Sequence, residues 1–520
     1  MKKIIFTLIL LSALGTSHVY SQTNNTHYFM HNLPQAHTIN PAQVPDYNFF
    51  IGGLIVPVVG QLPPPISLSI NTPIDYNDLF HYGRWEYKDS IITPFHPNGD
   101  LDEFLDKLKK VNYTTTNLDL NLLYVGFKQG EKNFWSFGIT DKMSSSFGIP
   151  KKLVTFSLLG NGVEQDATFS GLAMNMLYHR EYAIGFQRDI TRYFSLGGKI
   201  KLLTGLANIY TSPSSLTLHT EEETYIIHSS ANYVVNTNAP LEVTLDDKGF
   251  VDNIDLIDFE SSSNSDIVKD YLLFTGNNGV AIDVGFSKEW NSELSYFVNI
   301  TDVGYITWNT HTHNFSMAGS DADGSGFEFN GAEITGDNTS QNISDIVSLD
   351  TIVDSFDFEY TQDSYTTWLP WKIYAGAQYK FTKSFNIGAV GKFQKLPDRI
   401  KPSVTATANF NLGKISHISL SYSMLNGNYN NLGFGYAFNI ANFQWYLITD
   451  NLISSALFPY NTRSASFRMG CNFLLGYKDK TKRKKLPLFK PRRTPGNKSS
   501  NSTGLFGKKR KEKAVNAPDN

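Results

Sequence analysis

Apolar and polar side chains alternate at every second position through much of this chain. From residue 280 to residue 286 the even positions are apolar and the odd positions are small or polar. The same split recurs in residues 194–202, 385–393, 404–410 and 418–424. A period of two is that of a β-strand with one apolar and one polar face. The pattern therefore predicts an all-β protein.

Fourteen segments of the chain fit this description. Many run to ten residues or more, which is longer than the about 5–6 residues of an ordinary globular strand and matches the about 9–11 residues that cross a bilayer at a tilt. We place the expected strands at residues 64–71, 113–127, 133–142, 170–189, 192–205, 279–290, 293–306, 370–382, 384–396, 401–413, 415–425, 429–440, 442–451 and 463–476.

The connections between these strands distinguish two classes of all-β protein. A soluble secreted sandwich and a membrane barrel both alternate apolar and polar faces. Short turns here alternate with generally longer links, of which the longest span residues 72–112, 143–169, 206–278 and 307–369. Short turns at one rim and long loops at the other are typical of an outer-membrane barrel. We therefore predict a transmembrane antiparallel β-barrel of about 14 strands with long extracellular loops, at residues 64–477.

The N-terminal part of the chain predicts export. Lys2 and Lys3 precede a short apolar run, and small or modest side chains follow it, so residues 1–21 are expected to be a secretory signal peptide. Residues 22–63 are expected to form a periplasmic N-terminal segment or a plug in the lumen. Because three consecutive prolines at 63–65 cannot donate to a sheet, the strand-like stretch before them can alternatively be a kinked first strand.

Charge is distributed unevenly. The 520 residues carry a net charge of −3, yet residues 221–270 contain 12 acidic side chains against two lysines, and residues 311–371 contain 11 acidic side chains with no Lys or Arg. Residues 478–520 contain 15 Lys and Arg against three acidic side chains. Acidic, Ser- and Thr-rich loops are expected to be solvated outside the cell. The basic tail is expected to be a disordered periplasmic arm.

Three basic clusters in the tail are candidate partner-binding residues. In an exported protein they indicate attraction to anionic material, such as an acidic face of a periplasmic or envelope protein partner, rather than nucleic acid. Outer-membrane lipid is the other expected partner. A merely solvated tail that aids assembly is the alternative. The clusters are Lys482, Arg483, Lys484 and Lys485; Arg492 and Arg493; and Lys508, Lys509, Arg510 and Lys511.

One polar cluster is expected inside the barrel. Alternation places His179 and Glu181 on the luminal face of their strand, and Lys199 and Lys201 on the polar face of the next strand. Buried polar side chains of this kind usually form a structural hydrogen-bond network. No nucleophile elbow, phosphate loop or zincin motif is present. We therefore expect no enzyme activity and no cofactor.

Metal sites are likewise not expected. The single cysteine, Cys471, excludes an internal disulfide and a cysteine-based zinc site. Asp321 and Asp323 imitate the opening of a calcium loop, but the twelfth position of that loop is Ala332 where a bidentate Glu is needed. An acidic solvated loop explains these residues without a metal.

Short sequences in the chain resemble a known group of proteins. These are HNLPQ at residues 31–35, INPA at 39–42, REYAIG at 180–185 and GGKIKLLTG at 197–205. They resemble an uncharacterised Bacteroidota family of outer-membrane β-barrels with a domain of unknown function. The family is distantly similar to type IX secretion accessory barrels and to fatty-acid-transporter-like barrels. The resemblance implies an outer-membrane barrel and no established activity.

Two functions follow as hypotheses. The first is a structural or interaction component of the envelope, linked to secretion or assembly. The alternative is an outer-membrane transport channel for a small or hydrophobic solute, with the segment before residue 64 as its plug. Aromatic side chains on the luminal face, such as Tyr374, would favour a hydrophobic solute.

Overall fold

The structure is a computed structural model. It describes residues 25–57, 63–82, 90–96, 98–159, 166–212, 215–220, 227–247, 249–256, 276–320, 358–397, 399–413, 415–425, 428–452 and 463–477. The expected signal peptide, the calcium-like loop and the basic tail, with all ten of its candidate residues, lie outside these ranges.

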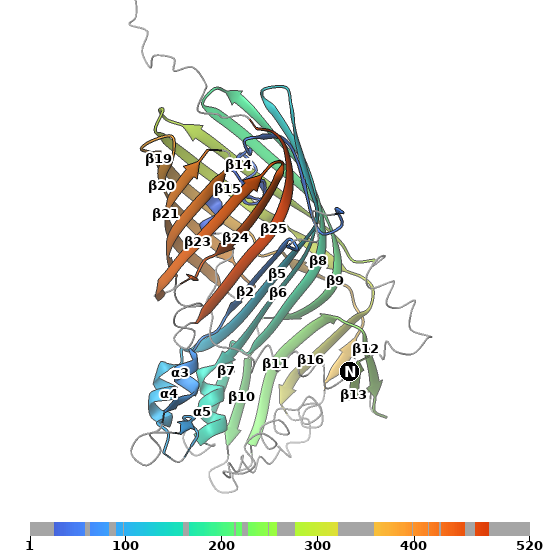
Figure 1. Cartoon of the computed structure of the whole chain (residues 1–520). Coiled ribbons are helices and arrows are strands. Elements are labelled where there is room, and N and C mark those ends of the chain that lie inside the picture. Colours follow the sequence, from blue (N-terminus) through green and yellow to red (C-terminus); the bar gives the residue numbers. More distant parts are fainter. Residues whose placement is uncertain are drawn as a thin grey trace, which may run out of the picture. The chain divides into compact units, whose positions relative to one another are not determined.

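The chain folds into a closed antiparallel barrel of 14 strands, in which each strand pairs with its sequence neighbour in the wall (Figure 1). Two short segments, β1 (Tyr47–Gly52) and β2 (Ile66–Asn71), together form the first strand. Both pair with the last strand on one side and with β5 on the other, which closes the barrel. The other strands are β5 (Val111–Gln129), β6 (Asn133–Pro150), β8 (Ala173–Thr191), β9 (Phe194–Thr211), β14 (Asn278–Glu289), β15 (Leu294–Trp308), β19 (Lys372–Lys380), β20 (Phe385–Lys395), β21 (Ile400–Leu412), β22 (Ser416–Leu425), β23 (Asn428–Ile440), β24 (Phe443–Thr449) and β25 (Ser464–Tyr477).

The fold class predicted from the sequence is confirmed. Every expected strand lies in the wall, and the largest difference is the length of β6, which continues to Pro150 although the expected strand ended at residue 142. Serines at 144–146 break the apolar alternation, yet the backbone of this part still pairs with β5. Apolar alternation is needed only where a strand faces lipid, so it does not mark the ends of strands that extend beyond the bilayer.

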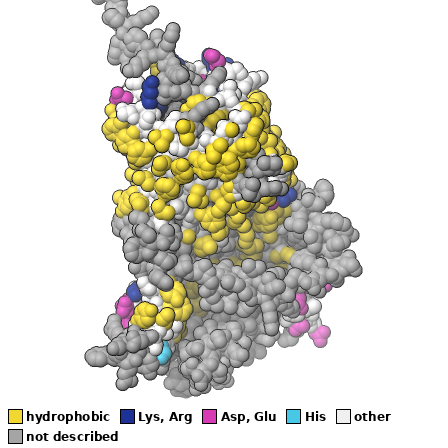
Figure 2. Space-filling model, viewed as in Figure 1, with side chains coloured by type: hydrophobic (Ala, Val, Ile, Leu, Met, Phe, Trp, Pro, Cys, Tyr) yellow, Lys and Arg dark blue, Asp and Glu magenta, His cyan; other side chains and the backbone are white. Residues whose placement is uncertain are grey.

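The outer face of the barrel is a band of apolar side chains (Figure 2). Ile184, Ile200 and Ile282, on neighbouring strands, are 58%, 67% and 50% exposed. The inward side chains that alternate with them are small or polar, and Lys199, Lys201 and Asp283 among them are buried. An apolar exterior around a polar interior is the inverse of a soluble protein and is the arrangement of a transmembrane barrel. No helix in the described part of the chain is long and apolar enough to cross a bilayer.

The first strand is interrupted in the middle. Gly52 pairs with Asn472 of β25, whereas Ile66 pairs with Met469, so the two segments of this strand meet β25 at two nearby positions. Gly53 follows β1 with a φ of +128°, a conformation that L side chains rarely adopt. The kinked first strand expected from the three prolines is present, and residues 47–52 belong to the barrel wall rather than to a separate segment ending at residue 63.

Beyond the barrel, the sheet continues on the side of the long connections. β7 (Asp166–Ser170), β10 (Ser215–Thr220), β11 (Ile227–Asn238), β16 (Thr312–Ser320), β17 (Glu359–Thr361) and β18 (Tyr365–Trp368) extend it, and β12 (Leu241–Leu245) pairs with β13 (Val251–Leu256). β3 (His81–Tyr82) and β4 (Ile91–Ile92) form a further pair. Helices α3 (Tyr76–Leu79), α4 (Leu101–Lys107) and α5 (Lys151–Leu159) lie at the same end (Figure 1). Asp100 caps α4, which buries Phe104 and Leu105.

Candidate functional site

Residues 25–44, called the plug here, lie inside the barrel. The plug contains two single turns, η1 (Thr26–Phe29) and α2 (Ala36–Ile39), and most of its side chains are buried. In Figure 1 it is the dark blue segment seen between the barrel strands. The plug lies within residues 22–63, for which the sequence left a periplasmic segment and a luminal plug open.

One asparagine shapes the turn by which the plug leads toward β1. Asn40 is fully buried, and its side-chain oxygen accepts a hydrogen bond from the backbone N–H of Ala42 at 3.0 Å. Its amide nitrogen donates to the hydroxyl of Tyr28 at 3.2 Å. The side chain thus satisfies a buried backbone donor and ties the two ends of the plug together.

Polar side chains on many strands hold the plug. The tightest group is at Thr26, whose backbone N–H and hydroxyl both donate to the carboxylate of Asp450, at 2.9 and 2.5 Å. Gln35 and Asn472 form a reciprocal amide pair, at 2.6 and 3.0 Å. Further hydrogen bonds join Tyr28 to Asn299, His31 to Gln378, Asn32 to His417, His37 to Ser136, and the ammonium of Lys199 to the carbonyl oxygen of His37.

Glycines line the wall where the plug comes nearest. A Cβ at Gly388 would lie 2.8 Å from ring atoms of Phe29, and a Cβ at Gly285 would lie 2.6 Å from Oδ1 of Asn40. Both distances are shorter than a van der Waals contact of about 3.5–4.0 Å. The lumen at these positions is therefore shaped to hold the plug. The other wall glycines whose Cβ would meet the plug are Gly185, Gly197, Gly433 and Gly435.

A network of ion pairs fills part of the lumen next to the wall residues that contact α2. Its centre is Lys201, which is 2% exposed and lies 2.8 Å from Asp283 and 2.6 Å from Asp302. Buried charges of both signs at such distances stabilise one another, and removing a partner leaves an uncompensated charge. The remaining pairs are Lys142 with Glu181 at 2.8 Å, Lys201 with Glu181 at 3.4 Å, Lys142 with Asp302 at 3.5 Å and Lys372 with Asp302 at 2.6 Å.

A β-bulge brings Asp302 into this network. The pairing of β14 with β15 shifts between Ile282 and Val284, and Asp302 there has a φ of +61°. A bulge adds one residue to a strand and re-aims the side chain. The backbone N–H of Asp302 donates to the carboxylate of Asp283 at 2.7 Å, which fixes the arrangement.

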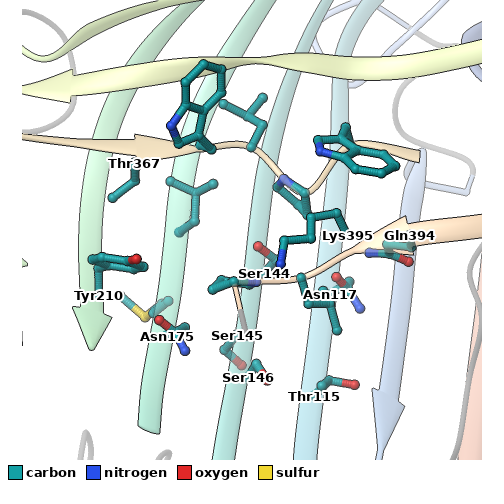
Figure 3. Close-up of a pocket in the computed structure, with 18 of the residues that line it drawn as sticks. Thr115, Asn117, Ser144, Ser145, Ser146, Asn175, Tyr210, Thr367, Gln394 and Lys395 are labelled. Atoms are coloured by element: carbon teal, nitrogen blue, oxygen red, sulfur yellow. The ribbon is translucent and has the colours of Figure 1, made fainter. Parts of the chain in front are cut away.

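A cavity of about 360 Å³ occupies the lumen on the side of the long connections. Two rows of side chains, each running across neighbouring strands, form one of its walls. The first row is Asn71, Thr115, Ser146 and Asn175, and the second contains Asn117, Ser144, Leu177 and Asn208. Figure 3 shows the hydroxyl and amide groups of Thr115, Asn117, Ser144, Ser146 and Asn175 standing side by side on β5, β6 and β8.

Basic and apolar side chains complete the lining. Lys392, Lys395 and Lys401 are the charged side chains among the described residues that line the cavity. Leu369 and Trp371 line it as well. The lining therefore combines hydroxyl and amide groups, positive charge and an apolar surface.

Aromatic stacking connects the cavity to the plug. The ammonium of Lys392 lies 5.8 Å from the centroid of the Tyr374 ring, and this ring stacks on Tyr28 of the plug with 5.4 Å between centroids. Tyr374 is only 2% exposed. It was expected to favour a hydrophobic solute by lining the lumen, but its ring faces the plug instead of an open path.

The structure brings together the four luminal residues proposed from the sequence. His179, Glu181, Lys199 and Lys201 are all buried inside the barrel, and Glu181 and Lys201 form an ion pair. Lys199 bonds the plug instead. Their acidic partners Asp283 and Asp302 were not foreseen, because pairing between strands decides which luminal side chains meet.

The two polar rows were also not foreseen. A signal for them is present in the sequence, since Ser, Thr and Asn crowd residues 114–117 and 144–146. This crowding extends the polar face of two expected strands beyond the lipid band. It would have indicated a polar wall, although it could not show a cavity.

Comparison with known proteins gives one family. The model of a family described as "Family of unknown function (DUF5723)" matches residues 41–450. No curated protein matches the chain in sequence.

Several solved barrels are similar in structure at low sequence identity. A Pseudomonas aeruginosa FadL homologue is 7% identical, with 89% of this chain and 98% of that chain covered and a TM-score of 0.39. The Ralstonia pickettii toluene transporter TbuX is 8% identical, with 86% and 94% covered and a TM-score of 0.36. The Pseudomonas putida toluene transporter TodX is 10% identical, with 88% and 93% covered and a TM-score of 0.33. These TM-scores are too low to carry a functional argument for this chain.

Proposed function

Because the chain belongs to the DUF5723 family of unknown function, we propose from its own geometry that it is an outer-membrane channel whose N-terminal segment closes the lumen. The channel passes a small solute when the plug moves. The short turns face the periplasm, and the long connections with the cavity face the outside of the cell.

The observation that carries this proposal is the fit of the plug in the lumen. Luminal side chains alone can fill a barrel of about 8 strands, whereas wider barrels leave a lumen. In this 14-strand barrel the wall beside the plug contains glycines, including Gly285 and Gly388, where a larger side chain would occupy the space of the plug. When the plug moves out of this lumen, an open path for a solute remains.

The character of the contacts also supports displacement. Pairs such as Gln35 with Asn472 and Asn32 with His417 are neutral hydrogen bonds. Water can replace such bonds, and each contributes only about 0.5–1.5 kcal/mol net. A plug held largely in this way can leave without unfolding the wall, whose backbone hydrogen bonds are internal.

Urea tests the proposal, because it solvates peptide groups and weakens the hold on a short segment before it unfolds a closed barrel. We expect purified full-length protein in a planar bilayer to be closed in buffer and to show reversible conductance steps in moderate urea. Heat-modifiable migration on gels reports that the barrel is intact. A folded barrel that stays closed while a protease cuts the plug contradicts the proposal.

The envelope-assembly function, with a partner bound through the basic tail, stays a prediction. The link to type IX secretion, the Bacteroidota origin, the signal peptide and the absence of enzyme activity stay predictions in the same sense. The proposed channel function does not depend on any of these predictions.

A further inference from the structure

The cavity is a built site with polar groups that lack partners among the described residues. Asn71 is 2% exposed, and its Nδ2 donates to the hydroxyl of Thr115 at 2.6 Å while its Oδ1 accepts nothing. Oδ1 of Asn175, which is 8% exposed, also accepts nothing. A buried polar atom without a hydrogen bond costs about 1–3 kcal/mol. Both side chains line the cavity, so its wall contains hydrogen-bonding groups that the described residues do not satisfy.

The two polar rows suit a ligand with several hydroxyl groups. Ser146 stands between Thr115 and Asn175 in the first row, and Ser144 stands beside Asn117 in the second. Hydroxyl and amide side chains each donate or accept, as the hydroxyl groups of a sugar do. A purely apolar solute would leave this wall unsatisfied.

The positively charged side chains in the lining favour a negatively charged ligand. Lys392 and Lys401 line the cavity together with Lys395, and no Asp or Glu is among the described lining residues. Arg399 and Lys109 lie near enough to Lys401 to act on its charge. A cavity with one sign of charge concentrates ligands of the opposite sign. The ligand is therefore expected to carry a carboxylate.

An apolar surface completes the recognition. Trp371 and Leu369 line the cavity beside the polar groups. The C–H face of a sugar ring buries apolar area against such a surface, while its hydroxyl groups bond the polar wall. A volume of about 360 Å³ lies at the small end of the range of small-molecule sites.

We propose that this cavity binds an acidic sugar, a hydroxyl-bearing ring with one carboxylate. The carboxylate is bound by Lys392 and Lys401, and the hydroxyl groups are bound by the rows of Asn71 and Asn117. This rests on the proposed function, for which it names the class of solute. Because the aromatic pair of Tyr374 and Tyr28 leads from Lys392 to the plug, an occupied cavity can act on the closed state.

Isothermal titration of the purified full-length protein tests the site at equilibrium, without any need for transport. Galacturonate is the probe, galactose lacks the carboxylate, and octanoate has a carboxylate without hydroxyl groups. We expect saturable binding of galacturonate and at least about tenfold weaker binding of both others, since each loses one set of charged or neutral hydrogen bonds. Equal binding of galactose, tighter binding of octanoate, or no saturable binding of galacturonate overturns the proposal.

Substitutions of the lining residues test whether the ligand binds in this cavity. Lys401→Gln should weaken galacturonate binding by about tenfold, and Lys401→Arg should retain most of it. Asn175→Leu should weaken galacturonate and leave the weak octanoate binding unchanged. Lys383→Gln, at the exposed turn between β19 and β20, is the matched control and should bind as the wild type does. Unchanged binding in folded Lys401→Gln overturns the site. A negative binding result would not change the expected urea-dependent conductance, so the sugar-binding proposal and the channel proposal can fail independently.

Discussion

A valine in place of Gly388 should open the channel. The substitution places a branched side chain where even a Cβ would lie 2.8 Å from two ring atoms of Phe29 and 2.9 Å from a third. A normal carbon contact of about 3.5–4.0 Å requires the ring to move by roughly 1 Å. The ring cannot move freely, because it packs edge-on against Tyr28 and Phe297 at centroid distances of 5.1 and 6.1 Å.

The strain falls on the closed state alone. Overpacking a filled core costs about 1–3 kcal/mol, and in the open state the valine faces a vacated lumen. This difference should raise the open fraction about 5- to 150-fold. Single-channel recording of Gly388→Val in planar bilayers measures the open fraction directly.

Gly391→Val is the matched control, because it lies on the same strand and a Cβ there meets only the carbonyl oxygen of Ala375, at 3.8 Å. Its open fraction should equal that of the wild type. Heat-modifiable migration of both variants reports that the barrels are folded. Equal open fractions for two folded variants would refute the account of the plug.

Three further predictions concern single contacts. Thr26→Val removes a hydrogen bond to the buried carboxylate of Asp450 and should raise the open fraction of the channel by about tenfold, measured as conductance. An open fraction equal to that of the wild type would contradict the role of this contact. Lys201→Met leaves its acidic partners unpaired and should destabilise the barrel by about 3–5 kcal/mol in urea titration, whereas an unchanged midpoint would contradict a stabilising network. Burial, with the charge of Lys199 beside it, holds the pKa of His37 well below its ordinary value of 6.5. A neutral imidazole therefore stabilises the plug above about pH 6.5, and this contribution is lost as the pH falls below that value. Conductance should rise between pH 7.5 and pH 5, and a rise of equal size in His37→Gln would assign the effect to other groups.

The sequence predicts the wall of this barrel well because lipid imposes the pattern. Each strand that crosses the bilayer must alternate, as β14 does with Ile282 outside and Asp283 inside. The stretch around Gly53 departs from this rule, and there the prolines at 63–65 already indicated a break. Strand parts outside the lipid, such as the end of β6, are under no such constraint and were missed.

The interior was less predictable for a different reason. Alternation places Lys199 and Lys201 in the lumen but does not say what they meet. Lys201 reaches Asp283 through the register of β9 with β14, and it reaches Asp302 through a bulge that shifts the alternation of β15. Lys199 reaches the plug, which is distant in the sequence. These partners are set by pairing and tertiary contact, which the pattern of one strand does not contain.

Locking the plug tests the central claim most directly. In a Cys471→Ala background, Gln35→Cys and Asn472→Cys replace a pair whose amide atoms lie 2.6 Å apart, so a short, cleavable thiol cross-linker can join the plug to β25. Uptake of a small solute into liposomes containing this protein is then measured in moderate urea, where the unlocked channel opens, before and after cleavage, with the single Gln35→Cys variant as the control. The account predicts no uptake through the locked barrel and recovery of uptake once the linker is cleaved. Equal uptake in the locked and cleaved states would contradict a channel that opens by movement of its plug.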